Sequence, residues 1–107
     1  MKLYSIPDFR GTGVAVRISQ IAADAGKALP PDNRVAMVLF REVSGGTGSS
    51  RVGDSSVNAT TGIPLSTNDS VLLPNISAAP WATFYALDEV YLFAPSSDTI
   101  SITYGWW

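Results

Sequence analysis

The stretch from residue 51 to residue 74, RVGDSSVNATTGIPLSTNDSVLLP, sets short apolar runs between turn-forming residues and contains hardly any helix former. Its glycines, asparagines and aspartates supply positive φ angles and side-chain hydrogen bonds to the local backbone. The pattern predicts successive β-hairpins, with Gly53 and Gly62 at positions of positive φ or of close packing. It favours a small all-β fold, and no catalytic chemistry is visible in this segment.

Strand patterns continue on both sides of this segment. Apolar residues alternate with other residues at Val14–Ile18 and Thr99–Tyr104, which predicts strands with one buried face. The mostly apolar run Val35–Val43 predicts a central strand covered on both sides. Residues 89–94 predict a strand that a tight hairpin over residues 95–98 joins to the final one.

Helical residues are few. One helical turn fits residues 21–27, before Gly26 and Pro30 stop it, and Trp81–Leu87 fits a helix or a strand equally well. Residues 44–50 (SGGTGSS) predict a loop.

A length of 107 residues suits one domain, and no linker divides the chain. The sequence therefore predicts a single β-sandwich or jelly-roll-like domain over residues 14–107. Residues 1–13 carry four large apolar side chains around Pro7, before Gly11 and Gly13, which predicts an extended N-terminal arm ended by a flexible joint. The alternative is that this segment is an edge strand of the same sandwich.

The composition excludes most catalytic chemistry. The chain contains no histidine and no cysteine, which excludes Ser-His-Asp and Cys-His arrangements, thiolate metal sites and disulfides. Most acidic residues stand at turn positions, where a bond to the local backbone is reason enough for them. We expect no enzyme activity and no cofactor, and any bound metal ion would be a hard, oxygen-ligated cation such as calcium.

Charge and hydropathy narrow the range of partners. The net charge is −2 and the seven basic residues are scattered, so no nucleic-acid-binding patch is expected. No apolar run approaches about 20 residues, so neither secretion nor membrane insertion is expected. Apolar residues make up 46% of the chain and charged residues only 15%, a balance that favours permanent assembly with other subunits.

The two ends of the chain carry the residues that we expect at an interface. Adjacent strand residues point to opposite faces, so Trp106 and Trp107 cannot both enter one core. A neighbouring subunit is the simplest contact for at least one of them, and the apolar arm needs cover as well. Alternatively, the arm is an edge strand and one tryptophan caps its own core. The predicted interface consists of Leu3, Tyr4, Ile6, Phe9, Trp106 and Trp107.

Other aromatic residues could form a core or a binding face. Tyr91 and Phe93 lie two apart on one strand face, and Trp81 stands near Phe84 and Tyr85. Core packing is the expected role of both groups, and a binding face is the alternative.

The order of three sequence words resembles a diffuse group of small virion proteins of tailed bacteriophages. The words are ALPPDNRVAMVLFREV, then the segment 51–74 quoted above, then LDEVYLFAPSSDTISITYG, and together they cover about residues 28–105. The resemblance implies a β-sandwich or jelly-roll domain that serves as a capsid cement (decoration) protein or as part of a fibre or spike. It brings no catalytic residues with it.

From this resemblance we expect a non-enzymatic cement protein bound outside the shell, at junctions between major capsid subunits. It would be made in the host cytoplasm, associate with itself as a dimer or trimer, and need no contact with DNA. The alternative is a carbohydrate- or receptor-binding module of a tail fibre or spike. That role needs an exposed aromatic platform with Asp, Asn or Arg nearby.

Overall fold

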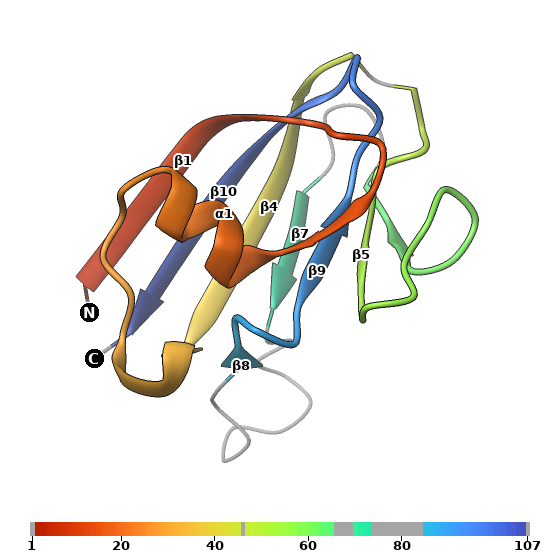
Figure 1. Cartoon of the computed structure of the whole chain (residues 1–107). Helices are drawn as coiled ribbons and strands as arrows, with labels where there is room; N and C mark the ends of the chain where they lie inside the picture. Colours follow the sequence, from red (N-terminus) through yellow and green to blue (C-terminus); the bar gives the residue numbers. More distant parts are fainter. Residues whose placement is uncertain (1, 46, 66–69, 74–84, 107) are drawn as a thin grey trace.

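The strands gather into two four-stranded antiparallel sheets and one small two-stranded sheet (Figure 1). The computed structural model describes residues 2–45, 47–65, 70–73 and 85–106. Sheet A has the strand order β1-β10-β4-β7, sheet B has the order β2-β9-β5-β6, and β3 pairs with β8. All-β is therefore the correct fold class.

The strand bounds are β1 (Lys2–Arg10), β2 (Ala15–Arg17), β3 (Arg34–Val35), β4 (Met37–Ser44), β5 (Arg51–Gly53), β6 (Ile63–Pro64), β7 (Ser70–Leu73), β8 (Tyr85–Ala86), β9 (Tyr91–Phe93) and β10 (Thr99–Trp106). Helix α1 spans Ile18–Asp24, and a short 3-10 turn spans Pro31–Asn33.

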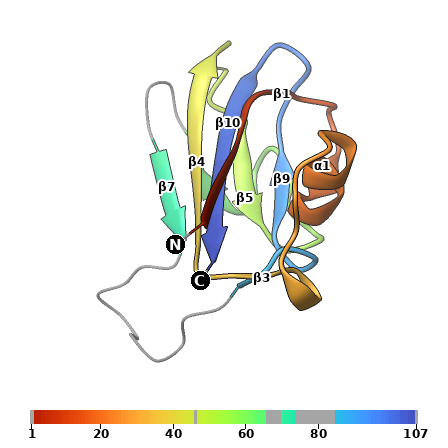
Figure 2. The same cartoon turned by 90° about the vertical axis from the view of Figure 1, so that its left-hand side faces the viewer.

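One hydrophobic cluster takes side chains from both sheets and from α1. Period-two alternation turns Ile100, Ile102 and Tyr104 of β10 inward, and Val52 and Leu92 reach the same cluster from sheet B. In Figure 2 sheet A forms one layer, while α1 and sheet B lie on its inner side. Fully buried residues such as these hold the two layers together, each contributing about 1.5–3 kcal/mol of transfer free energy.

The helix begins earlier than its sequence predicts. Ile18, expected at the end of a strand, is the first residue of α1, and its N–H bonds to the Val90 carbonyl at 2.9 Å. Ile18, Ile21 and Ala22 are buried on one face of the helix. Lys27 N–H then bonds to the Ala22 carbonyl and Gly26 has φ +70°, a left-handed helix end that only glycine adopts easily.

The predicted connection between the last two strands is wrong. Residues 95–98 do form a tight turn, closed by a 3.0 Å bond from Asp98 N–H to the Pro95 carbonyl. The turn does not make a hairpin, however, because β9 belongs to sheet B and β10 to sheet A. The chain uses this turn to cross from one layer to the other.

The hairpin prediction for residues 51–74 is correct only in its first half. Arg51 lies opposite Pro64 and Val52 opposite Ile63, so β5 and β6 form a hairpin. Strand β7 instead leaves for sheet A and pairs with β4. Gly62 has φ +116°, while Gly53 has no positive φ but lies close to Val57, so both glycines satisfy the prediction.

Strand β4 is not covered on both sides, as the run Val35–Val43 had suggested. Val38 and Phe40 are fully buried, whereas Met37 and Leu39 are half-buried and Arg41 is exposed. A continuous apolar run can therefore line the outside of a sheet. Of the ambiguous segment Trp81–Leu87, Tyr85 and Ala86 form β8, and residues 81–84 lie outside the described part of the chain.

The predicted N-terminal arm is an edge strand in the residues that the structure describes. Strand β1 pairs along β10, with Tyr4 opposite Tyr104 and Ile6 opposite Ile102. The alternative left open by the sequence is thus the correct one, because the apolar side chains of β1 alternate in step with those of β10.

Candidate interaction surfaces

The outer face of sheet A carries apolar side chains where a solvated face would be polar. Leu3 is 60% exposed and Leu72 is 45% exposed, on the two edge strands of the sheet. Between them the register places Leu39 opposite both Leu72 and Thr103. Arg41 is the only charged side chain on this face among the described residues of β4, β7 and β10, so these three strands present a partly apolar face of low charge. The sheet A outer face consists of Leu3, Ser5, Met37, Leu39, Arg41, Val43, Ser70, Leu72, Ser101, Thr103 and Gly105.

The outer face of sheet B is of a different kind. Tyr91 and Phe93 flank the fully buried Leu92 and are half-buried themselves, so the expectation that they pack in the core is wrong. The register places Tyr91 opposite Arg17 and Phe93 opposite Arg51. The Arg17 guanidinium lies 5.8 Å from the centre of the Tyr91 ring, within cation–π range. We call these four residues the Tyr91–Phe93 face.

Most of the predicted interface residues belong to the monomer's own packing. Ile6 is 5% exposed and belongs to the core cluster, and Phe9 packs against that cluster. Tyr4 and Trp106 are half-buried, and Leu3 alone of the described members is largely exposed. Trp107 lies outside the described residues.

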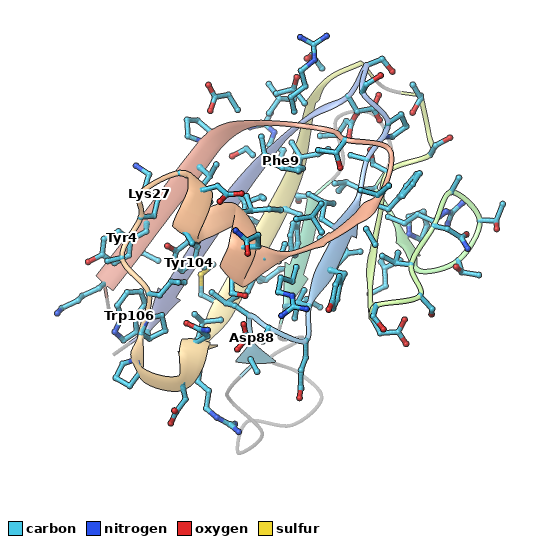
Figure 3. All side chains as sticks on the ribbon, in the orientation of Figure 1. Tyr4, Phe9, Lys27, Asp88, Tyr104 and Trp106 are labelled. Carbon is cyan, nitrogen blue, oxygen red and sulfur yellow. The ribbon has the colours of Figure 1, made fainter. Side chains whose placement is uncertain are left out.

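Three aromatic rings stack where β1 meets the end of β10 (Figure 3). The Tyr4 ring centre lies 5.1 Å from that of Trp106 and 5.9 Å from that of Tyr104. The Tyr104 hydroxyl donates to the Ala28 carbonyl at 2.6 Å, which ties the segment after α1 to the sheet. Burial, and then the neighbouring Tyr4, raises the pKa of Tyr104.

A buried acid cluster lies where the loop after β4 meets the turn before β10. Asp98 is fully buried, and it accepts hydrogen bonds from the Ser50 hydroxyl at 2.7 Å and the Thr47 hydroxyl at 2.9 Å. Glu42, only 2% exposed, is also hydrogen-bonded to Asp98. Burial alone would raise the pKa of Asp98, but the bonds from Ser50, Thr47 and Glu42 outweigh it and lower that pKa.

A hydrogen bond between two carboxyl groups requires a proton on one of them. The bonds from Ser50, Thr47 and Glu42 favour the ionised form of Asp98. The cluster joins strand, loop and turn, and its hydroxyl donors point at one carboxylate that no solvent reaches. This arrangement suits a structural clamp better than a catalytic pair, which must reach a substrate.

Two other carboxylates have clear local roles. Asp88 accepts hydrogen bonds from the Ser19 hydroxyl and the Asn33 side-chain amide, which fasten the start of α1 to the turn before β9. Asp54 accepts from the N–H and hydroxyl of Ser56 within its own turn. In each case the hydroxyl bond is the main cause of a lowered pKa, from Ser19 for Asp88 and from Ser56 for Asp54.

Within the described ranges, no group of three or more His, Cys, Asp or Glu side chains is placed to hold a metal ion. No helix among those same residues is long and apolar enough to cross a membrane.

Comparisons with protein-family models, with curated proteins and with solved structures found no match to this chain.

One of these features could have been foreseen from the sequence, and another could not. Glu42 has the same parity as Val38 and Phe40, so a period-two strand must turn it inward with them. Tyr91 and Phe93 lie on either side of Leu92 in the sequence. The neighbouring residues do not indicate whether the strand buries Leu92 or the two aromatic side chains. That choice depends on the partner sheet.

Proposed function

We infer that the two sheets form a single jelly-roll sandwich. Leaving the short β3 and β8 aside, eight strands remain, and they pair in nested fashion: β1 with β10, β2 with β9, β4 with β7 and β5 with β6. The pairs β10–β4 and β9–β5 then join this folded ribbon into two sheets. Such nesting is the connectivity of a jelly roll, and the single core cluster supports one domain.

We propose that the chain is a non-enzymatic capsid cement protein of a tailed bacteriophage, with the major capsid protein as its partner. It would be made in the host cytoplasm and lie on the capsid exterior, across junctions between capsid subunits. The observation that carries this proposal is the sheet A outer face, which exposes Leu3, Val43 and Leu72 and has little charge on β4, β7 and β10. Monomeric proteins seldom leave such a face to water.

The size of this face explains why self-association would help. Four strands spaced about 4.8 Å apart and four to nine residues long present roughly 400–500 Å² in projection. A stable interface usually buries about 800 Å² on each partner. One copy would therefore bind a shell weakly, and a dimer or trimer that engages two or three sites at once would bind far more tightly.

The test is co-sedimentation of the full chain with purified shells that lack it. Leu72→Glu places a charge on the sheet A outer face, and we expect it to weaken shell binding by about tenfold or more. Tyr91→Ser, which alters the outer face of sheet B, is the matched control and should bind like the wild type. Undiminished binding of Leu72→Glu would refute the assignment of this face.

A carbohydrate- or receptor-binding module of a tail fibre or spike is the second candidate. The Tyr91–Phe93 face favours it, since two aromatic side chains on one strand face beside the exposed Arg17 suit the apolar face and the acidic groups of a sugar. In that case Tyr91→Ser and Phe93→Ser would abolish binding to an acidic glycan array, and Leu72→Glu would not.

A further inference from the structure

We propose that two copies of the chain associate by pairing their β1 strands antiparallel about a two-fold axis at Tyr4. The two A sheets then become one continuous sheet of eight strands. This interface would account for the self-association of the proposed cement protein, and in that respect it rests on the proposed function. The occupant of the β1 edge is a second copy of this chain.

The backbone geometry shows which groups of β1 are available. The Gly105 carbonyl accepts a hydrogen bond from the Ala36 N–H at 2.8 Å, so Gly105 faces β4. In an antiparallel sheet the N–H and C=O of a residue point to the same side, and opposed residues form either a hydrogen-bonded or a non-hydrogen-bonded pair. Leu3 lies opposite Gly105, so the Leu3 N–H and C=O point away from β10.

Two further observations support this assignment. The Asp98 carbonyl, at an even position like Tyr104, accepts a bond from Gly11 on the β1 side. The hydroxyls of Ser5 and Thr103 approach to 3.1 Å, as suits the closer spacing of a non-hydrogen-bonded pair. Ser5 therefore also directs its N–H and C=O outward from the sheet edge.

The register between the two β1 strands is set by the length of the regular part of β1. A bulge interrupts β1 between Ile6 and Phe9 and contains Pro7, which has no N–H, so pairing beyond Ile6 is blocked. The regular described segment is Lys2–Ile6, and its midpoint is Tyr4. A two-fold axis there places Leu3 opposite Ser5 of the second copy, and the outward groups of both residues then form a hydrogen-bonded pair on each side of the axis.

The side chains suit this register. Tyr4 of one copy meets Tyr4 of the other as a close, non-hydrogen-bonded pair, which extends the three-ring stack across the axis. On the other face, Leu3, which is 60% exposed in one copy, gains cover from the neighbouring strand. The sheet A outer face becomes twice as wide.

Charge complementarity points to a second copy. Exposed Lys2 lies on the same face as Tyr4, and in this register it stands opposite Ile6 of the second copy, next to the bulge that contains Asp8. Asp8, Arg10 and Asp24 border a groove of about 400 Å³ whose wall includes Ile6, Phe9 and Val16, so its rim carries two acidic groups and one basic group. The apolar stem of Lys2 fits such a groove while its ammonium meets a carboxylate on the rim, and the symmetry forms this contact twice.

The first test is sedimentation equilibrium of the full chain, for which we expect a dimer of twice 11.3 kDa. Ser5→Pro removes an outward N–H that β10 does not use, and it should weaken the dimer by about tenfold or more while circular dichroism stays native. Leu72→Glu, at the far edge of sheet A, should leave the dimer intact. A monomer or a trimer for the wild type, or a dimer unaffected by Ser5→Pro, would overturn the proposal.

The second test uses the absence of cysteine from the chain. Leu3→Cys and Ser5→Cys, mixed and mildly oxidised, should form a covalent heterodimer, because the paired Cα atoms lie about 5.5 Å apart. Neither variant alone should cross-link, since like residues lie about 7–8 Å apart on the diagonal. Cross-linking of Leu3→Cys alone, or failure of the mixture, would show that this register is wrong.

These outcomes are independent of the shell-binding assay. A chain that dimerises through β1 without binding shells would contradict the cement role alone, and a monomer that still binds shells would contradict the β1 interface alone.

Discussion

Asp98→Asn is the substitution that tests the buried acid cluster most directly. It keeps the shape of the side chain and removes the negative charge that accepts hydrogen bonds from two hydroxyl groups. These are the Ser50 hydroxyl at 2.7 Å and the Thr47 hydroxyl at 2.9 Å. A hydrogen bond to a charged group contributes about 1.5–3 kcal/mol and a neutral one about 0.5–1.5 kcal/mol. Two such bonds weakened together should cost about 2–3 kcal/mol, or roughly 10–15 °C in melting temperature for a domain of this size.

The sign of the pH dependence follows from the lowered pKa of Asp98. An unfolded-state aspartate titrates near pH 3.9, above the folded-state pKa. The stabilisation is therefore fully present above about pH 5 and is lost as the pH falls through the folded-state value. Urea unfolding at about pH 7 and at about pH 2.5 should show a smaller difference in stability between the wild type and Asp98→Asn at the lower pH than at the higher one.

Glu42→Gln is the matched control for this prediction. Its amide N–H can donate a hydrogen bond to Asp98 without a titratable proton, so stability at neutral pH should change by about 1 kcal/mol or less. The reasoning fails if Asp98→Asn unfolds like the wild type at pH 7, if the gap between them is undiminished in acid, or if Glu42→Gln is the more damaging change.

Three further substitutions, two of them with a matched control, probe close packing and a hydrogen bond, each followed by thermal melting. Gly62→Val should cost on the order of 1–3 kcal/mol, since φ is +116° and a Cβ would lie 2.7 Å from the Val57 side chain; an unchanged melting temperature would contradict the β5–β6 hairpin. Gly11→Ala should cost on the order of 3 kcal/mol or more, because a Cβ would lie 1.9 Å from the Pro95 carbonyl oxygen, whereas Gly48→Ala has open space and should cost about 1 kcal/mol. Tyr104→Phe should lose about 1–2 kcal/mol with the bond to the Ala28 carbonyl, while Tyr4→Phe keeps the ring stack and serves as its control; equal losses would show that the hydroxyl bond is not what matters.

The sequence alone was enough for the fold class and for much of the local structure. Turn residues, the scarcity of helix formers and period-two alternation predicted strands at the positions of β2, β4, β9 and β10. The strained or crowded glycines, Gly53 and Gly62, were also predictable, because the need for positive φ or for a missing Cβ is a property of a few adjacent residues. Such signals act over less than about ten residues.

The tertiary structure decided which strands pair and which face of each is buried. Tight turns normally join paired strands, yet the turn at residues 95–98 carries the chain from sheet B to sheet A. Strand β9 pairs with β2 and β5, and β10 pairs with β1 and β4. The same long-range pairing puts Tyr91 and Phe93 on the outside and makes an edge strand of the expected arm. The alternation of apolar and polar residues can be seen within one strand. Which face of that strand is buried depends on the opposite sheet, whose residues are distant in the sequence and close only in the folded chain.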